Sequence, residues 1–272
     1  MSISFIAGVP LGINILDFGF FRASIGSTMI PIFTSHYSRK SLLTFLEPEK
    51  AEKETKQSLF TLCKKHEIKN PVVVEDYMTG FMELFQNAKK LDIFPRFGLT
   101  FKFNNSTDEA CADNWHKVIV FLKNTDGYKD LVKFHNQVHI HQAGIIYPEN
   151  LKTLWTKNMI LFIPHYDAWH SRNAMYDVNC IPDFAGLDTH YFRQSNNLPF
   201  DNLISSRIPA DAASITDCKS IFYEKREDFK YWQTYICALN FNHKGKNRSI
   251  ESPAFSHCHS DDFCFESYLE SK

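Results

Sequence analysis

The sequence predicts one globular α+β domain spanning residues 1–272, with helices concentrated in residues 41–91 and a mainly antiparallel sheet from later, short strands. Hydrophobic residues make up 44% and charged residues 22% of the chain, an ordinary mixture that can bury a core. Apolar residues recur at helical spacings before residue 91, whereas short apolar runs ending in polar turn residues follow Pro95. No linker, low-complexity tract or charge block divides the chain.

The first third of the chain contains the clearest helical patterns. Residues 1–34 are apolar and interrupted by Gly and Pro, which predicts short strands joined by tight turns. A helix is expected over residues 49–66, because Pro48 suits a first helical turn and good helix formers follow it. A second helix is expected over residues 74–91, where apolar side chains recur at spacings of three and four.

The remainder of the chain predicts alternating short strands and short helices. The expected strands are residues 97–103, 118–122, 159–163 and 235–241. The expected helices are residues 107–116, 128–134, 149–155 and 224–232. The long stretch 180–214 is rich in turn residues and predicts an irregular segment, and such segments are often functional.

Three segments share an apolar run followed by a His and then an Arg, which suggests weak internal strand and helix repeats. They are MIPIFTSHYSR, MILFIPHYDAWHSR and CALNFNHKGKNR.

Bulk properties exclude several classes of protein. The chain has 30 Lys+Arg against 31 Asp+Glu, so it offers no global field for a polyanion and nucleic-acid binding is not expected. Neither a membrane span nor a signal peptide is expected, which indicates cytoplasmic synthesis and leaves export by a signal-independent route open. Seven cysteines, an odd number, favour reduced thiols. P-loop, GxGxxG, GxSxG, HExxH and paired CxxC motifs are absent.

Histidines suggest three alternative metal sites, although the cofactor remains unknown. His165 and Asp167 follow an apolar run and, with His243, would form the two-His, one-carboxylate set of a non-haem metal enzyme, with Arg248 binding a substrate acid. His139 and His141 lie on one side of an expected strand, near His135. A third cluster could hold zinc and consists of His257, Cys258, His259 and Cys264.

We favour a reactive thiol over these metal sites. Cys180 lies at the start of the irregular segment, and a nearby His190 or His165 could lower its pKa and give a thiolate nucleophile. Asp167 or Asp188 would orient that histidine. Cys218, beside Lys219, is a second candidate of the same kind.

Two functions follow from such a thiol. The first is a Cys-His enzyme that transfers or hydrolyses an acyl group through a thioester. The second is a non-enzymatic effector or interaction protein whose cysteine carries a fatty acyl chain, which would attach it to a membrane surface. A plain interaction protein without chemistry is equally compatible with the sequence, which does not indicate the oligomeric state.

Overall fold

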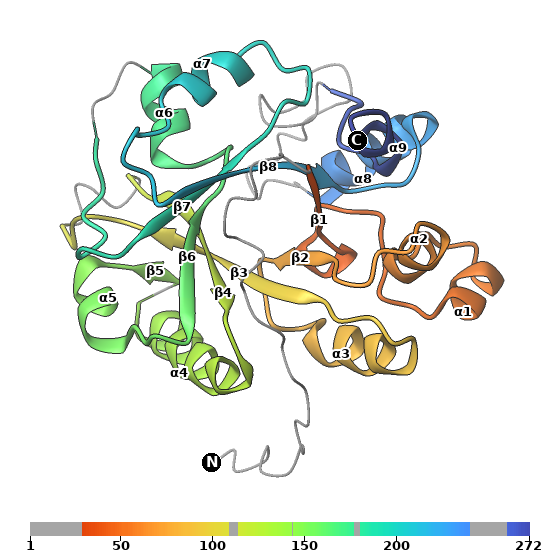
Figure 1. Cartoon of the computed structure of the whole chain (residues 1–272), viewed down its shortest axis with the longest axis horizontal. Coiled ribbons are helices and arrows are strands. Elements are labelled where there is room, and N and C mark those ends of the chain that lie inside the picture. Colours follow the sequence, from red (N-terminus) through yellow and green to blue (C-terminus); the bar gives the residue numbers. More distant parts are fainter. Residues whose placement is uncertain (1–28, 109–113, 143, 177–179, 240–259) are drawn as a thin grey trace.

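The computed structural model describes residues 29–108, 114–142, 144–176, 180–239 and 260–272 (Figure 1). Within this part of the chain, seven strands close into a barrel, because β2 pairs with both β1 and β3. These strands are β1 (Ile30–Phe33), β2 (Val72–Glu75), β3 (Arg96–Phe103), β4 (His116–Leu122), β6 (Met159–Ile163), β7 (Thr189–Arg193) and β8 (Ser214–Ile221). A two-residue strand, β5 (Ile145–Ile146), pairs with the end of β3.

The barrel is mostly parallel, so the expected antiparallel sheet is wrong. Only β4 runs antiparallel to its neighbours, β3 and β6, and the other barrel pairs are parallel. Parallel strands need long crossover connections, which the helices between the strands supply. The expected combination of helices and strands in one globular unit is confirmed at that coarse level.

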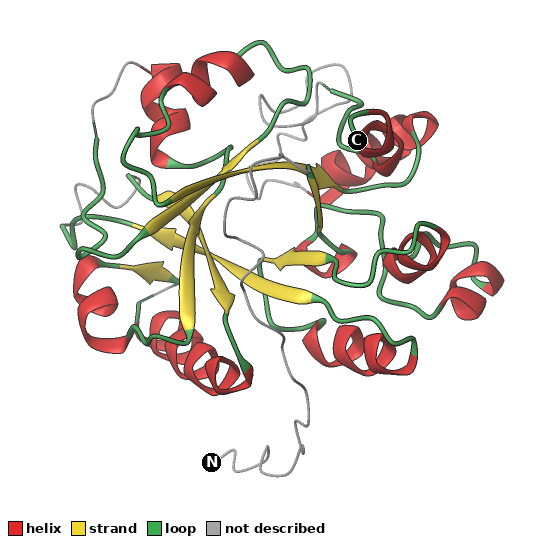
Figure 2. Ribbon diagram, in the orientation of Figure 1, coloured by secondary structure: helices red, strands yellow, loops and turns green. Residues whose placement is uncertain are grey.

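Helices surround the barrel on its outside (Figure 2), and they are distributed along the described chain and not concentrated in residues 41–91. They are α1 (Pro48–Lys53), α2 (Leu59–Lys65), α3 (Phe81–Lys90), α4 (Thr125–His141), α5 (Pro148–Leu154), α6 (Trp169–Tyr176), α7 (Asp201–Ser206), α8 (Phe229–Leu239) and α9 (Phe265–Glu270), with 3-10 turns η2 (His36–Ser38) and η4 (Arg226–Asp228). No helix in the described residues is long and apolar enough to cross a membrane.

Several local predictions are confirmed and others are wrong. The expected strands 97–103, 118–122 and 159–163 are confirmed as β3, β4 and β6, and the expected helix 149–155 as α5. The expected strand 235–241 is wrong, because α8 runs through Leu239.

The expected helix 74–91 begins too early, since the three valines before it form the buried strand β2. The expected helix 49–66 is broken, because Ser58 bridges to Thr44 and caps a separate helix α2. The stretch 180–214 contains β7 and α7. Where helix 107–116 was expected, His116 instead begins β4, and residues 109–113 lie outside the described part.

Apolar side chains fill the barrel interior. The rings of Phe121, Phe162 and Phe192 pack against one another with centroids 4.6 to 6.0 Å apart. Gly98 of β3 makes this packing achievable, because a Cβ there would lie 2.7 Å from the Phe121 ring. Each buried side chain of this size contributes about 1.5 to 3 kcal/mol to folding. The barrel interior beneath the strand ends is therefore filled by packed apolar side chains.

The strand ends at one rim of the barrel carry polar residues. The rim is formed by the carboxyl ends of the parallel strands and, because β4 runs the other way, by the amino end of β4. In parallel α/β barrels, catalytic residues come from the carboxyl ends of the strands and the loops that follow them. This rim is the place to look for a functional site.

Candidate functional site at the barrel mouth

A cavity of about 80 Å³ lies at this rim, and every barrel strand or the loop after it contributes to its lining. Ile32, Val74, Ile119 and Phe192 give it an apolar base. Its polar lining residues are Thr34, Lys40, Asp76, Thr100, Lys117, Tyr166, Asp167, Gln194 and Ser220. The cavity has room for a small molecule or for the head group of a larger one.

Lys40 and Asp76 form the first of two ion pairs in the cavity. Lys40 follows the η2 turn after β1, and Asp76 follows the last residue of β2. The amine of Lys40 contacts Asp76 Oδ2, and the Thr100 hydroxyl donates to Asp76 Oδ1. Burial raises the pKa of Asp76, but Lys40 and Lys117 lower it by more, so its pKa lies below the usual value and the carboxylate stays ionised.

Lys117 and Asp167 form the second ion pair. Lys117 Nζ lies 2.6 Å from Asp167 Oδ2, and the Lys117 amide donates to the Asp167 carbonyl at 2.9 Å. Asp167 has a left-handed backbone with φ of 61°, a conformation that L residues adopt at a cost. Both backbone and side-chain contacts therefore fix this carboxylate beside Lys117.

The two lysines differ in their electrostatic environment. Burial lowers the pKa of Lys40, and the charge of Lys117 lowers it further, against the opposing effect of Asp76. Burial also lowers the pKa of Lys117, but Asp167 and Asp76 outweigh it and the pKa lies above its usual value. Of the two amines, Lys40 is therefore the one that loses its proton more readily.

A buried carboxyl group holds the loop that carries Lys40. Glu75 is fully buried, and its two oxygens accept from the Ser35 amide at 2.6 Å and from the Ser38 hydroxyl. The Ser38 hydroxyl in turn accepts from the Asp76 amide at 2.7 Å. Burial raises the pKa of Glu75 to about 7, against the effect of these hydrogen bonds. Glu75 therefore ties the β1 loop to the end of β2, where Lys40 meets Asp76.

The two candidate thiols, Cys218 and Cys180, have different surroundings in the structure. Cys218 is fully buried inside the barrel, where burial raises its pKa well above the usual value. Cys180 is partly buried, and the histidine it contacts is His116, with Sγ 3.5 Å from Nε2. His190 Nδ1 lies 2.7 Å from the Ser214 hydroxyl, while His165 is fully buried with Nε2 3.9 Å from Asp201 Oδ1.

The metal candidates are only partly within the described residues. His243, Arg248, His257, Cys258 and His259 lie outside them. Inside them, no group of three or more His, Cys, Asp or Glu side chains is arranged to hold a metal ion.

The remaining members of these metal sets have other surroundings. Asp167 pairs with Lys117, and Cys264 caps helix α9. His139 and His141 lie at the end of helix α4 and not on a strand, with the rings of His135 and His139 4.2 Å apart.

Sequence reasoning missed Lys40, Asp76 and Lys117. Asp167 was singled out, but as a metal ligand or as the carboxylate that orients a catalytic histidine. A signal was present, because Asp76 and Asp167 both follow buried apolar runs that end in polar residues. That signal does not show that the ends of these two strands lie at the same rim, because the rim is defined only by the barrel topology.

Comparison of the sequence with known proteins finds no matching family model and no matching curated protein.

Proposed function

We propose that this protein is an imine-forming enzyme that binds a small aldehyde or ketone covalently on Lys40. The observation that carries the proposal is the pair of neighbouring lysines in one cavity, of which one has a lowered and the other a raised pKa. A lysine becomes a nucleophile at neutral pH when it is desolvated or placed beside another cation. Burial in the cavity lowers the pKa of Lys40, and neighbouring Lys117 lowers it further, against the opposing charge of Asp76.

Each charged group has a role in forming the imine. Asp76 accepts a proton from the Lys40 ammonium, and the free amine attacks the carbonyl carbon. Charged Lys117 stabilises the negative charge that develops on the carbonyl oxygen, and Asp167 holds Lys117 in place. The oxygen then takes a proton from the nitrogen to give a carbinolamine.

Loss of water completes the step. Asp76 returns its proton to the carbinolamine hydroxyl, the C–O bond breaks, and water and a protonated imine remain. The overall change converts an ammonium and a carbonyl into an iminium and water, so protons and charge balance. The iminium withdraws electrons from the adjacent carbon, which supports cleavage or formation of a carbon–carbon bond there. A lyase is the enzyme class that uses this chemistry.

Trapping with borohydride tests the proposal directly. The full chain is incubated with glyceraldehyde and sodium cyanoborohydride, which reduces an imine to a stable secondary amine, and the modified lysines are mapped by peptide mass spectrometry. We expect Lys40 to be modified faster than any exposed lysine. Lys40→Met should remove this adduct, and Lys90→Met, at an exposed ion pair with Glu47, should not. Modification spread evenly over the surface lysines would contradict the proposal.

The contact between Cys180 and His116 supports a second candidate, the thiol function. His116 is buried, and burial together with the charge of Arg172 lowers its pKa to about 4, so the imidazole is a neutral base at pH 7. Two hydrogen bonds between the Asn173 side chain and the Cys180 backbone, of 2.8 and 3.2 Å, position the cysteine. His116 would take the thiol proton while Cys180 attacks an acyl thioester and displaces its thiolate.

Intact mass before and after neutral hydroxylamine tests this second candidate. A thioester on Cys180 adds an acyl mass that hydroxylamine removes, whether the acyl group is a reaction intermediate or a fatty chain for membrane attachment. Cys180→Ser should abolish the added mass, and His116→Gln should reduce it. Cys237→Ser, in helix α8, is the matched control and should leave it unchanged. An unmodified mass after incubation with an acyl thioester would contradict it.

A further inference from the structure

The mouth cavity has a charged half and an uncharged half. Its two lysines and two aspartates come from the loop after β1, the ends of β2 and β4 and the loop after β6. The ends of β7, β8 and β1 contribute neutral polar side chains, namely Gln194, Ser220 and Thr34. Around the barrel, the charged set covers the arc from β1 to β6 and the neutral set the arc from β7 to β1, so the two arcs meet at β1. A ligand that reacts on Lys40 therefore has a neutral polar wall for the rest of the molecule.

The orientation of the Gln194 amide is fixed by its oxygen. Gln194 Oε1 accepts from the Ser220 amide at 3.1 Å and from Asn196 Nδ2 at 3.0 Å. These two bonds use both lone pairs of the oxygen. The amide nitrogen Nε2 has no hydrogen-bond partner in the described part of the chain, although Gln194 is buried in the cavity wall. Gln194 therefore presents a hydrogen-bond donor, Nε2, and not an acceptor to the cavity.

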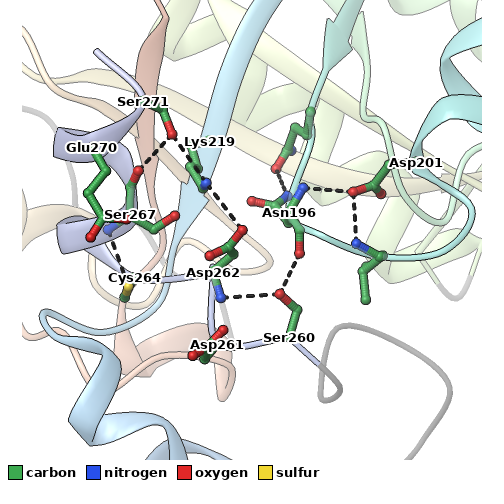
Figure 3. A network of polar contacts seen from close by, with 12 residues as sticks. Asn196, Asp201, Lys219, Ser260, Asp261, Asp262, Cys264, Ser267, Glu270 and Ser271 are labelled. Carbon is green, nitrogen blue, oxygen red and sulfur yellow. Dashed lines mark hydrogen bonds and ion pairs between the residues drawn. The ribbon is translucent and has the colours of Figure 1, made fainter.

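A buried network behind Gln194 keeps this orientation. Asn196 Nδ2 also donates to the Tyr166 hydroxyl at 3.0 Å, and Tyr166 donates to Asp201 Oδ1 at 2.7 Å. The other oxygen of Asp201 accepts from the Asn196 amide at 2.7 Å, so Asn196 is held from two sides (Figure 3). Asn196 Oδ1 is buried without a partner among the described residues, a cost that a purely structural network would avoid. Such rigid support is typical of a binding group.

The balance of charge in the cavity disfavours an anionic ligand. Two lysines face two aspartates, and the described residues of the lining include no arginine. A phosphate or carboxylate on the ligand would meet two aspartates as well as two lysines, so the cavity offers it no net positive charge. The volume of about 80 Å³ suits a molecule of three or four carbons.

We infer that Gln194 selects the substrate by donating a hydrogen bond from Nε2 to its hydroxyl group, and that the substrate is a small, uncharged hydroxy-aldehyde or hydroxy-ketone. This inference rests on the proposed imine chemistry of Lys40. Gln194 is a specificity-determining residue in this scheme, and Lys40 is the residue that forms the bond.

Three related carbonyl compounds test the two parts of the inference, the hydrogen bond from Gln194 and the preference for an uncharged substrate. Trapping at Lys40 is compared for glyceraldehyde, for propanal, which has the same carbons without hydroxyls, and for glyceraldehyde 3-phosphate. We expect glyceraldehyde to be trapped about tenfold more efficiently than propanal, the effect of one good hydrogen bond. It should also be trapped more efficiently than glyceraldehyde 3-phosphate, whose phosphate would meet Asp76 and Asp167. Gln194→Leu should lower trapping of glyceraldehyde to the level of propanal and leave propanal unchanged. Gln86→Leu, on the exposed face of α3, is the control.

Each outcome has a distinct meaning. Gln194→Glu keeps the shape and an acceptor oxygen but loses the donor, so it should reproduce the loss if Gln194→Leu fails to fold, as judged by its melting temperature. Equal trapping of all three compounds, or preference for the phosphate, would overturn the inference and leave Lys40 as the reactive lysine. Failure of every carbonyl compound to modify Lys40 would overturn the proposed function as well.

Discussion

Two lysines of this protein, Lys117 and Lys219, each face an aspartate, but their surroundings differ. Lys117 lines the mouth cavity, and 21% of its side-chain surface is accessible. Lys219, on β8, is only 4% accessible and lies under the C-terminal segment 260–272. Its Nζ is 3.7 Å from Asp262 Oδ2 and 3.5 Å from the Ser271 hydroxyl (Figure 3). A Lys–Asp pair therefore lines an accessible cavity in one region and forms a buried structural contact in the other.

The contact at Lys219 fastens the C-terminal segment to the barrel. Backbone hydrogen bonds of 2.9 and 3.0 Å join Phe263 to Phe222 and Phe265 to Tyr223, and Arg226 also bonds Asp262. Burial lowers the pKa of Lys219, and Asp262 opposes that effect. A buried charge with one carboxylate partner depends on that partner for stability, whereas Lys117, which has both Asp167 and Asp76 nearby, depends less on either one.

Asp262→Asn should have the largest effect on stability. It leaves the Lys219 ammonium buried without its carboxylate, which we expect to cost about 4 kcal/mol of unfolding free energy. Because the folded pKa of Lys219 is then lowered further, the folded state binds this proton less tightly than the unfolded state. The loss should therefore be greatest at neutral pH and shrink as the pH rises toward the unfolded value of 10.5. Urea unfolding followed by tryptophan fluorescence measures both effects.

The control for this prediction is an exposed ion pair of the same region. Glu227→Gln removes the partner of Lys225, which lies at 3.2 Å on the surface, and should cause no measurable change. A loss at Asp262 as small as that at Glu227 would show that Lys219 is solvated and that the two regions do not differ.

Glu75→Gln should have the next largest effect on stability. It tests whether buried Glu75 is the group that holds the loop carrying Lys40 at the barrel mouth. Burial raises the folded pKa of Glu75 from 4.5 to about 7, so the folded state binds this proton more tightly than the unfolded state. Its contribution to stability is present below pH 4.5 and declines as the pH rises to about 7, by about 3 kcal/mol at most. Glu75→Gln should remove this decline, as measured by unfolding at several pH values.

Glu49→Gln, on the surface of α1, is the control and should leave the pH dependence of the wild type unchanged. An identical pH dependence in Glu75→Gln and in the wild type would mean that Glu75 is already ionised in the folded state.

The parts of the fold that could be predicted are those set by local pattern. The strand 159–163 is a continuous apolar run, and β6 occupies the same residues. The pairing of strands depends instead on partners far apart in the chain, so a closed, mostly parallel barrel was not foreseeable from short strands. β2 was assigned to a helix because the apolar stripe of α3 follows it without an obvious boundary.

The candidate site was less predictable than the fold. A lysine such as Lys40 or Lys117 ordinarily lies on the surface, and only the barrel brings these two together with Asp76. Asp167 attracted attention because it follows an apolar run, but its partner is Lys117, the second residue of strand β4. Cys180 was expected beside His190 or His165, and folding places it beside His116. Which side chains become partners depends on contacts between residues far apart in the chain, and the spacing of residues in the sequence does not determine those contacts.

Asp167→Asn should have the smallest effect on stability and a clear effect on chemistry, in contrast to Asp262→Asn. Lys117 keeps 21% of its side-chain surface accessible and Asp76 remains nearby, so we expect a loss of about 1 kcal/mol. Without Asp167, the pKa of Lys117 falls, and Lys117 loses part of the charge that keeps the pKa of Lys40 low. Trapping of glyceraldehyde at neutral pH should then fall about fivefold and recover at higher pH, where Lys40 is deprotonated. If Asp167→Asn instead destabilised the protein as strongly as Asp262→Asn and left trapping unchanged, the mouth pair would be a structural contact like the one at Lys219.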